Sequence, residues 1–292
     1  MTHPIHFWNI FFVVVFFAAL LTGCTSERKP ANVDSEPSVP SHQAGEPVAE
    51  EPVVPTSPVK QLKLDNTATG DEELAKICRE NPELLELTLG GTQVTDAGLT
   101  YLPQLAKLKK IRLSKTAITD AGMKALARCE RLEDLDVSQT AVGDPGVLEL
   151  ASLPRLKRIN LYLTFVTDSG LDSFQEGKHR SAAAIEWLNL DKCPITDGGL
   201  PKLASLRKLA WLHLGGTAIT DVGLAELAKL ESLKEVTVTK TETTPTGIEK
   251  LRQARPDMTL RDNVSEKTPP EDIEEAAEYR KQLAPIREKG RT

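Results

Sequence analysis

The sequence contains few of the residues from which catalytic and metal sites are built. Its 292 residues include five histidines and four cysteines. No histidine stands in a metal-ligand spacing such as HExxH, and no glycine-rich phosphate loop follows a predicted strand. No Ser, His and Asp set is recognisable from spacing alone. We therefore expect a protein that is not an enzyme and that holds no metal and no cofactor.

The sequence also lacks an excess of basic residues. It has 36 Lys and Arg against 42 Asp and Glu, a formal net charge of -6. The acidic excess lies mostly in residues 25–58, which leaves the middle of the chain close to neutral. Because proteins that bind nucleic acids or anionic membranes usually present a basic face, we expect no nucleic-acid partner.

Charged residues are missing from residues 1–23, which hold an unbroken apolar run from Ile10 to Leu21. Such a short apolar core predicts a secretory signal peptide rather than a spanning helix, which needs about 20 apolar residues. Leu21-Thr22-Gly23-Cys24 resembles the lipobox of bacterial lipoproteins, which implies that Cys24 is lipidated. No Lys or Arg precedes the core, so an uncleaved anchor (Ile5 to Leu21) or a misassigned start is the alternative. We expect a membrane-tethered, extracytoplasmic protein.

Two segments have compositions that do not favour a packed core. Residues 24–58 begin with Cys24, hold seven prolines and predict a disordered linker. Residues 263–292 are charged and predict a disordered or partly helical tail. A helix from Glu271 to Gln282 would carry a thin apolar stripe, including Ala276 and Leu283, too weak to require a partner.

A 24-residue phrase, LxxLxLxxTxITDxGLxxLxxLxx, recurs between these two segments. Each copy begins with a period-two alternation, typical of a strand, and continues with a 3.6-residue period, typical of a short helix. One unit of this length cannot bury its own apolar face, so neighbouring units must stack. We predict about eight units over residues 59–262. The first apolar position falls at Leu84, Leu108, Leu132, Leu156, Ile185, Leu209 and Leu233, with one step of 29 residues before Ile185.

The phrase resembles the cysteine-containing (ribonuclease-inhibitor-like) leucine-rich repeat family. The resemblance implies an α/β solenoid, a horseshoe with a parallel concave sheet and outer helices. The family's cysteine is retained at Cys193, whereas threonine replaces it in the other units (Thr92, Thr116, Thr140, Thr164, Thr217 and Thr241). Many relatives are substrate-recognition arms of ubiquitin ligases, but no F-box-like segment precedes the repeats here, so that role is not carried over.

Polar and small residues recur at fixed places in the phrase. Threonine and aspartate before each predicted helix, such as Thr119-Asp120, are expected to cap its first turn rather than to bind metal. The glycine that follows, such as Gly122, is expected to permit close packing at the strand-to-helix corner. Cys129 and Cys193 lie in units too distant for a disulfide, so we predict none.

The residues between the strand leucines face the concave surface. In the first units they alternate in charge, as in Lys110, Asp134 and Arg158, which predicts a cross-strand salt ladder. In later units Trp187 and Trp211 occupy adjacent strands. Exposed aromatic residues are typical interface anchors, although two tryptophans can instead stack on each other. The candidate ligand-binding residues are Tyr162, Trp187, Asn189, Trp211 and His213, beside a five-residue insertion at about residues 177–184.

The sequence thus predicts a non-catalytic, lipid-anchored, extracytoplasmic leucine-rich repeat module of the bacterial cell envelope. We expect its concave face to recognise a protein or an envelope polymer. The alternative is a structural envelope protein or spacer that self-associates and has no specific ligand.

Overall fold

The computed structural model describes residues 59–175, 184–262 and 270–290, which belong to one compact unit. The predicted signal peptide, Cys24, the linker 24–58 and insertion residues 177–183 lie outside the described residues. Among the helices that are described, none combines the length and the apolar character needed to cross a membrane.

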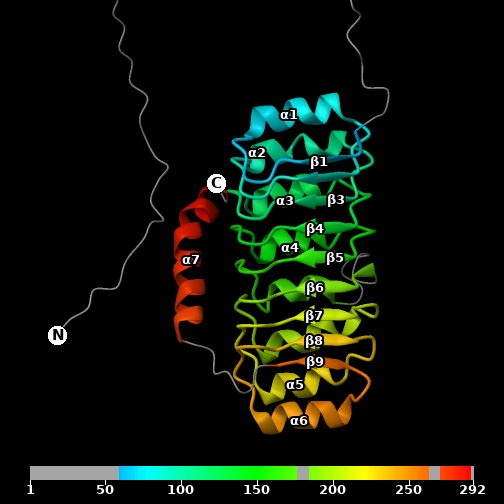
Figure 1. Ribbon diagram of the computed structural model, residues 1–292, viewed down its shortest axis with the longest axis vertical. Coiled ribbons are helices and arrows are strands. Elements are labelled where there is room, and N and C mark those ends of the chain that lie inside the picture. Colours follow the sequence, from blue (N-terminus) through cyan, green and yellow to red (C-terminus); the bar gives the residue numbers. More distant parts are fainter. Residues whose placement is uncertain (1–58, 176–183, 263–269, 291–292) are drawn as a thin grey trace, which may run out of the picture. The chain divides into compact units, whose positions relative to one another are not determined.

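Nine strands form one parallel sheet and follow one another in sequence order (Figure 1). The units are in strict register, so that Glu86 pairs with Lys110 and Trp187 with Trp211. The predicted α/β leucine-rich repeat solenoid is confirmed, with eight strand-helix units and a ninth strand. The strands are β1 (Gln61–Lys63), β2 (Glu86–Thr88), β3 (Lys110–Arg112), β4 (Asp134–Asp136), β5 (Arg158–Asn160), β6 (Trp187–Asn189), β7 (Trp211–His213), β8 (Glu235–Thr237) and β9 (Thr259–Arg261).

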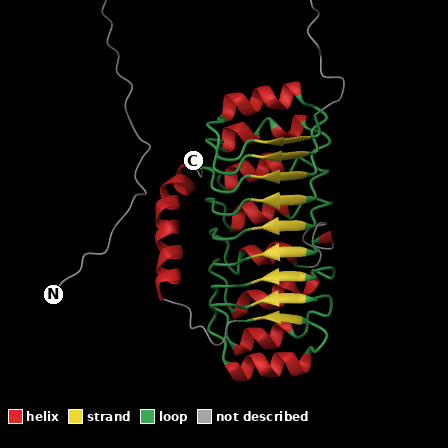
Figure 2. Ribbon diagram, in the orientation of Figure 1, coloured by secondary structure: helices red, strands yellow, loops and turns green. Residues whose placement is uncertain are grey.

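Short helices cover one face of the sheet (Figure 2). Three of them, η1, η2 and η4, are 3-10 helices, and in η4 Pro201 has no backbone N–H with which to continue an α-helical ladder. The helical segments are α1 (Asp71–Glu80), α2 (Asp96–Leu99), η1 (Leu102–Gln104), α3 (Asp120–Leu126), α4 (Asp144–Leu150), η2 (Gly170–Phe174), η4 (Asp197–Ser205), α5 (Asp221–Leu227) and α6 (Pro245–Ala254).

One contiguous apolar core fills the space between the sheet and the helices. The central residue of each inner strand, such as Leu135 in β4, is buried there. Cys78, Cys129 and Cys193 are free and buried. Burial raises the pKa of Cys78 to about 11 and that of Cys129 to about 12, so both are protonated thiols that act as apolar packing.

The chain turns after each of the strands β1 to β8 through a residue with positive φ, such as Lys115 at 57° and Gln139 at 56°. The repeated threonine then closes the turn: the Thr140 hydroxyl donates to the Val137 carbonyl at 2.6 Å. The same bond recurs in the other threonine units, so a threonine hydroxyl serves where the resembling family has a cysteine. We call this row of turns, at the carboxyl ends of the strands, the turn edge.

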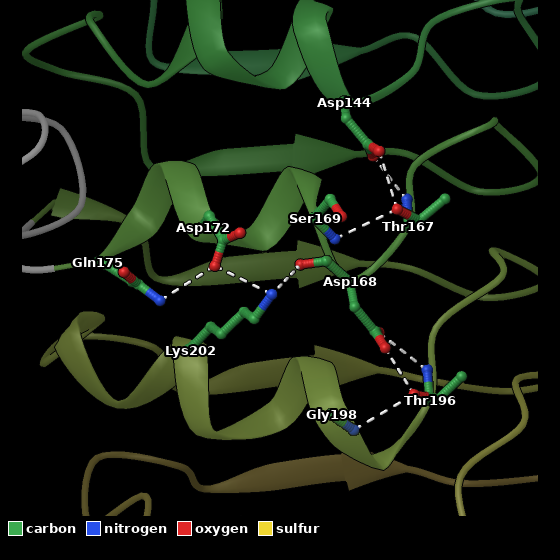
Figure 3. A network of polar contacts seen from close by, with 9 residues as sticks. All are labelled: Asp144, Thr167, Asp168, Ser169, Asp172, Gln175, Thr196, Gly198 and Lys202. Carbon is green, nitrogen blue, oxygen red and sulfur yellow. Dashed lines mark hydrogen bonds and ion pairs between the residues drawn. The ribbon is translucent and has the colours of Figure 1, made fainter.

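An aspartate–threonine ladder joins successive units (Figure 3). Threonine caps its own helix as predicted, since Thr196 Oγ1 accepts from Gly198 N. Aspartate was expected to do the same, but its carboxylate binds the next unit instead. Asp144 accepts from the backbone N–H of Thr167 at 2.7 Å and from its hydroxyl at 2.8 Å, and Asp168 binds Thr196 in the same way. Each carboxylate therefore ties one unit to its successor.

The repeated glycines leave room for this ladder. A Cβ atom added at Gly199 would lie 2.4 Å from Oδ1 of Asp168, and one at Gly223 would lie 2.4 Å from Oδ1 of Asp197. The predicted close packing at the corner is therefore confirmed, and the carboxylate of the preceding unit is what packs there.

The tail contains one helix, α7 (Pro270–Lys289), which lies along the turn edge (Figure 1). Ala276 and Leu283 on its inner face are buried. The weak apolar stripe, which was not expected to require a partner, therefore has one. Polar side chains on the same face of α7 also contact the turn edge, and the apolar pattern of the sequence does not reveal them.

These polar side chains bind main-chain carbonyls of the turns. Tyr279 Oη donates to the carbonyl of Gln139 at 2.9 Å. Arg280 donates through Nε to the carbonyl of Thr164 at 3.1 Å, and through Nη2 to that of Lys192. Turn carbonyls need partners when they are covered, and α7 supplies them.

Candidate binding surface

The face of the sheet opposite the helices, here called the sheet face, begins with paired charges. Asp134 Oδ2 lies 3.8 Å from Lys110 Nζ on one side and 3.6 Å from Arg158 Nε on the other. Arg112 and Asp136 form a parallel rung at 3.2 Å. The predicted cross-strand salt ladder is confirmed, and its charged side chains pair largely with one another.

The sheet face changes character at β6 and β7. Their register places Trp187 beside Trp211 and Asn189 beside His213. Trp211 is 38% exposed, among the most exposed large apolar side chains of the described residues. We call these four residues the tryptophan patch. The alternation of the strands points all four to the face that the helices do not cover.

Neighbouring groups hold the patch in place. The ring centroids of Trp187 and His213 are 5.4 Å apart at an interplanar angle of 54°, and the Arg158 guanidinium lies 4.8 Å from the Trp187 ring centroid. Within the described residues the ring contact of Trp187 is thus with histidine rather than with Trp211. Trp187 is fixed by this packing, whereas Trp211 presents its ring to solvent.

Asp191 follows the last residue of β6 by two positions and supports the patch from one side. Its Oδ2 is 3.8 Å from Nδ1 of His213, and its Oδ1 accepts from Gly215 N at 2.5 Å. Burial raises the pKa of Asp191. Asn189 accepts from Asp191 N through Oδ1, so its amide nitrogen is the group it can offer to a ligand.

Sequence reasoning missed the role of Asp191 beside the patch. It also assigned Arg158 to the salt ladder alone, although this side chain serves the ladder and the Trp187 ring together. The signal for Asp191 was its place two residues after Asn189, where most other units have small residues such as Ser114, although the first unit has Asp65.

Tyr162 lies apart from the tryptophan patch. It follows β5 by two residues and lies in the turn after that strand, which is part of the turn edge. The Lys192 ammonium lies 6.0 Å from its ring centroid, and Tyr162 contributes to raising the pKa of Tyr279 in α7, after burial as the main cause. The structure thus places four of the five candidate residues together and associates Tyr162 with α7.

The described residues contain no group of three or more His, Cys, Asp or Glu side chains arranged to hold a metal ion. The repeated aspartates are each engaged in a ladder bond to the next unit.

Comparison with known proteins agrees with this architecture. A family model described as Leucine Rich repeat matches residues 104–127 and 129–151. The solved structure of an internalin C2 from Listeria monocytogenes is similar, with 25% sequence identity and a TM-score of 0.54. The match covers 70% of this chain and 80% of that chain. A comparison with curated proteins finds no match. The chain therefore has a leucine-rich repeat fold.

Proposed function

We propose that this chain is a non-catalytic recognition module that binds a protein or an envelope polymer through the tryptophan patch. Lipidation at Cys24 anchors it to a membrane outside the cytoplasm in this proposal, and residues 24–58 act as the spacer. Leucine-rich repeat proteins commonly act as protein-interaction modules, which supports a protein partner.

The single observation that carries the proposal is the contrast between the two halves of the sheet face. In the first half Lys110 and Arg158 both pair with the carboxylate of Asp134. In the second half Trp211 leaves more than a third of its surface exposed beside polar groups. Interface anchors are typically aromatic side chains held by fixed neighbours, because little conformational entropy is then lost on binding.

A photo-crosslinking experiment tests the patch. A benzophenone amino acid at position 235, which pairs in register with Trp211, should capture a discrete partner in cell-envelope extracts. The double change Trp187→Ala and Trp211→Ala should lower that capture at least about thirtyfold, because central aromatic anchors are commonly worth 2 kcal/mol or more.

Two controls make this result specific. The same crosslinker at Val222, which is 65% exposed on α5, should capture nothing. The double change Lys110→Ala and Arg112→Ala alters the same face away from the patch and should leave capture unchanged. Equal capture by the tryptophan variant and its parent, with the far-UV circular dichroism intact, would refute the patch as the binding site.

The alternative is a structural protein that self-associates. The sheet ends in β1 and β9, each hydrogen-bonded to one neighbouring strand. Both strands carry outward charged residues, Lys63 and Arg261, which disfavour edge-to-edge pairing. This favours the recognition module, and sedimentation velocity of the purified protein at several concentrations distinguishes the two proposals: a concentration-dependent oligomer would support self-association.

The anchor has its own test. Cells that express the protein and are fed an alkyne-tagged fatty acid should label it, and the change Cys24→Ala should reduce that label to background. The control Cys78→Ala alters a cysteine of the folded unit and should retain the label. Equal labelling of the Cys24→Ala form and its parent would contradict lipidation at this residue.

A further inference from the structure

One rung of the aspartate–threonine ladder differs from the others. In six described rungs the carboxylate receives both a backbone N–H and a threonine hydroxyl from the next unit. Asp120 faces Gly143, which has no hydroxyl. Its Oδ1 accepts from Gly143 N at 2.6 Å and Gly146 N at 3.0 Å. Its Oδ2 is buried without a hydrogen bond in the described part of the chain.

Arg287 of α7 occupies the space that this exception leaves. Its Nε lies 4.0 Å from Oδ2 of Asp120, an ion pair without a hydrogen bond. A Cβ atom added at Gly143 would lie 2.4 Å from Nη2 of Arg287. The missing side chain is therefore what admits the guanidinium.

A second exception lies in the next unit. Phe165 stands at a position where the other units carry smaller or polar residues, such as Ala141 and Ala218. The Arg287 guanidinium lies 4.8 Å from the centroid of its ring. A buried carboxylate, an aromatic face and an empty Cβ position meet at one point, and this combination suits a planar cation better than the point charge of an ammonium.

The remaining contacts of α7 would allow another helix to take its place on the turn edge. Of its described side chains only Ala276 and Leu283 are buried apolar groups. A cavity of about 410 Å³ lies between the helix and the turns, lined by Cys193, Ala218 and Arg280 among others. From Ala276 onward, where its side chains are described, the helix is thus held mainly by polar side chains, and its docked face is incompletely packed.

We propose that Asp120, Gly143 and Phe165 form an arginine-binding socket on the turn edge. In the resting chain α7 is the ligand of this socket. A partner protein that presents an arginine on a helix would bind the turn edge by displacing α7. This surface is separate from the tryptophan patch, and neither proposal depends on the other.

The test compares three full-length chains with different sockets. The parent has the socket filled by Arg287. Arg287→Ala leaves it vacant. Gly143→Thr restores the side chain found at the other rungs, whose hydroxyl can bond Asp120 and fill the space, so this variant is expected to fold. Gly70→Thr is the matched control: Gly70 also caps its helix with extended backbone, and nothing lies within 4 Å of its Cβ position.

Release of α7 is measured first, by tryptic cleavage after Arg280 and Lys281 under native conditions. Both Arg287→Ala and Gly143→Thr should speed this cleavage about tenfold, the change expected for the loss of one partly buried ion pair with a cation–π contact. Gly70→Thr should cleave like the parent.

Occupation of the socket is measured second, with a fluorescent peptide of residues 276–290 as the arginine-bearing helix. The peptide should bind the Arg287→Ala chain about tenfold more tightly than the parent or the Gly143→Thr chain. A peptide with alanine in place of Arg287 should lose that gain. Equal binding to the Arg287→Ala and Gly143→Thr chains would overturn the socket, since α7 is released in both but only one socket is vacant. Equal binding to the parent and to the Arg287→Ala chain would overturn it as well.

Discussion

Replacing Asp197 by alanine is expected to lower the free energy of unfolding by about 3 kcal/mol, because it removes two charge-assisted hydrogen bonds between units. Asp197 accepts from Thr220 N at 2.8 Å and from Thr220 Oγ1 at 2.6 Å. The loss leaves the backbone N–H of Thr220 without its partner at the interface of two units. Urea unfolding followed by far-UV circular dichroism measures the change.

A graded pair of controls separates the ladder from a general loss of charge. Asp197→Asn keeps an oxygen acceptor for Thr220 N and should cost about 1 kcal/mol. Glu226→Ala removes a carboxylate that pairs with Lys229 on the surface of α5 and should cost no more than about 0.5 kcal/mol. If Asp197→Ala proves as mild as Glu226→Ala, the ladder does not hold the units together.

Replacing Phe174 by alanine should have the largest effect on stability, about 4 kcal/mol, because it removes a fully buried ring from a packed core. Phe174 ends η2 in the unit with the 29-residue step. It occupies the row in which the other units carry leucine, for example Leu150 and Leu203. Its carbonyl also accepts a hydrogen bond from the Ser205 hydroxyl of the next unit.

The change Phe174→Ala should also split the single unfolding transition into two, one for each half of the solenoid. Units of a solenoid contact mainly their neighbours, so a defect between two central units weakens the coupling of the halves on either side. Hydrogen exchange should then give different free energies of opening for the amides of β2–β4 and for those of β7–β8. In the parent the two groups of amides should open with the same free energy. Phe174→Leu restores the side chain of the other units and should cost about 1 kcal/mol without dividing the transition. A single cooperative transition in the Phe174→Ala form would argue against this account.

Much of the fold follows from the period of the sequence. Each strand and helix is specified by residues within one unit, and outside the 29-residue step the side chains in register on neighbouring strands are 24 residues apart, as in the pairs Lys110–Asp134 and Trp187–Trp211. The salt ladder and the tryptophan patch were therefore predictable, because alternation along a strand and register between strands decide which side chains share a face.

The patch was predictable as a set of neighbours but not in its internal contacts. Trp187 packs on His213 and Arg158, whereas from the sequence the alternative to ligand binding was that the two tryptophans stack on each other. Side chains on one sheet face have several possible partners, and rotamers and the space between strands decide among them. Asp191 was missed because its contact with His213 crosses from the end of one strand to the next.

The sequence by itself determined the number of units, the order of the strands, and the rows of leucine, threonine and tryptophan, because short-range periodicity encodes contacts between adjacent units. The tertiary structure alone decided where the ladder carboxylates bind and that α7 docks on the turn edge. That docking joins Tyr279 to Gln139 across 140 residues, and Arg287 to Asp120 beside Gly143. Such contacts depend on carbonyls and an empty Cβ position that exist as a surface only after the units have stacked, so no local pattern in the tail announces them.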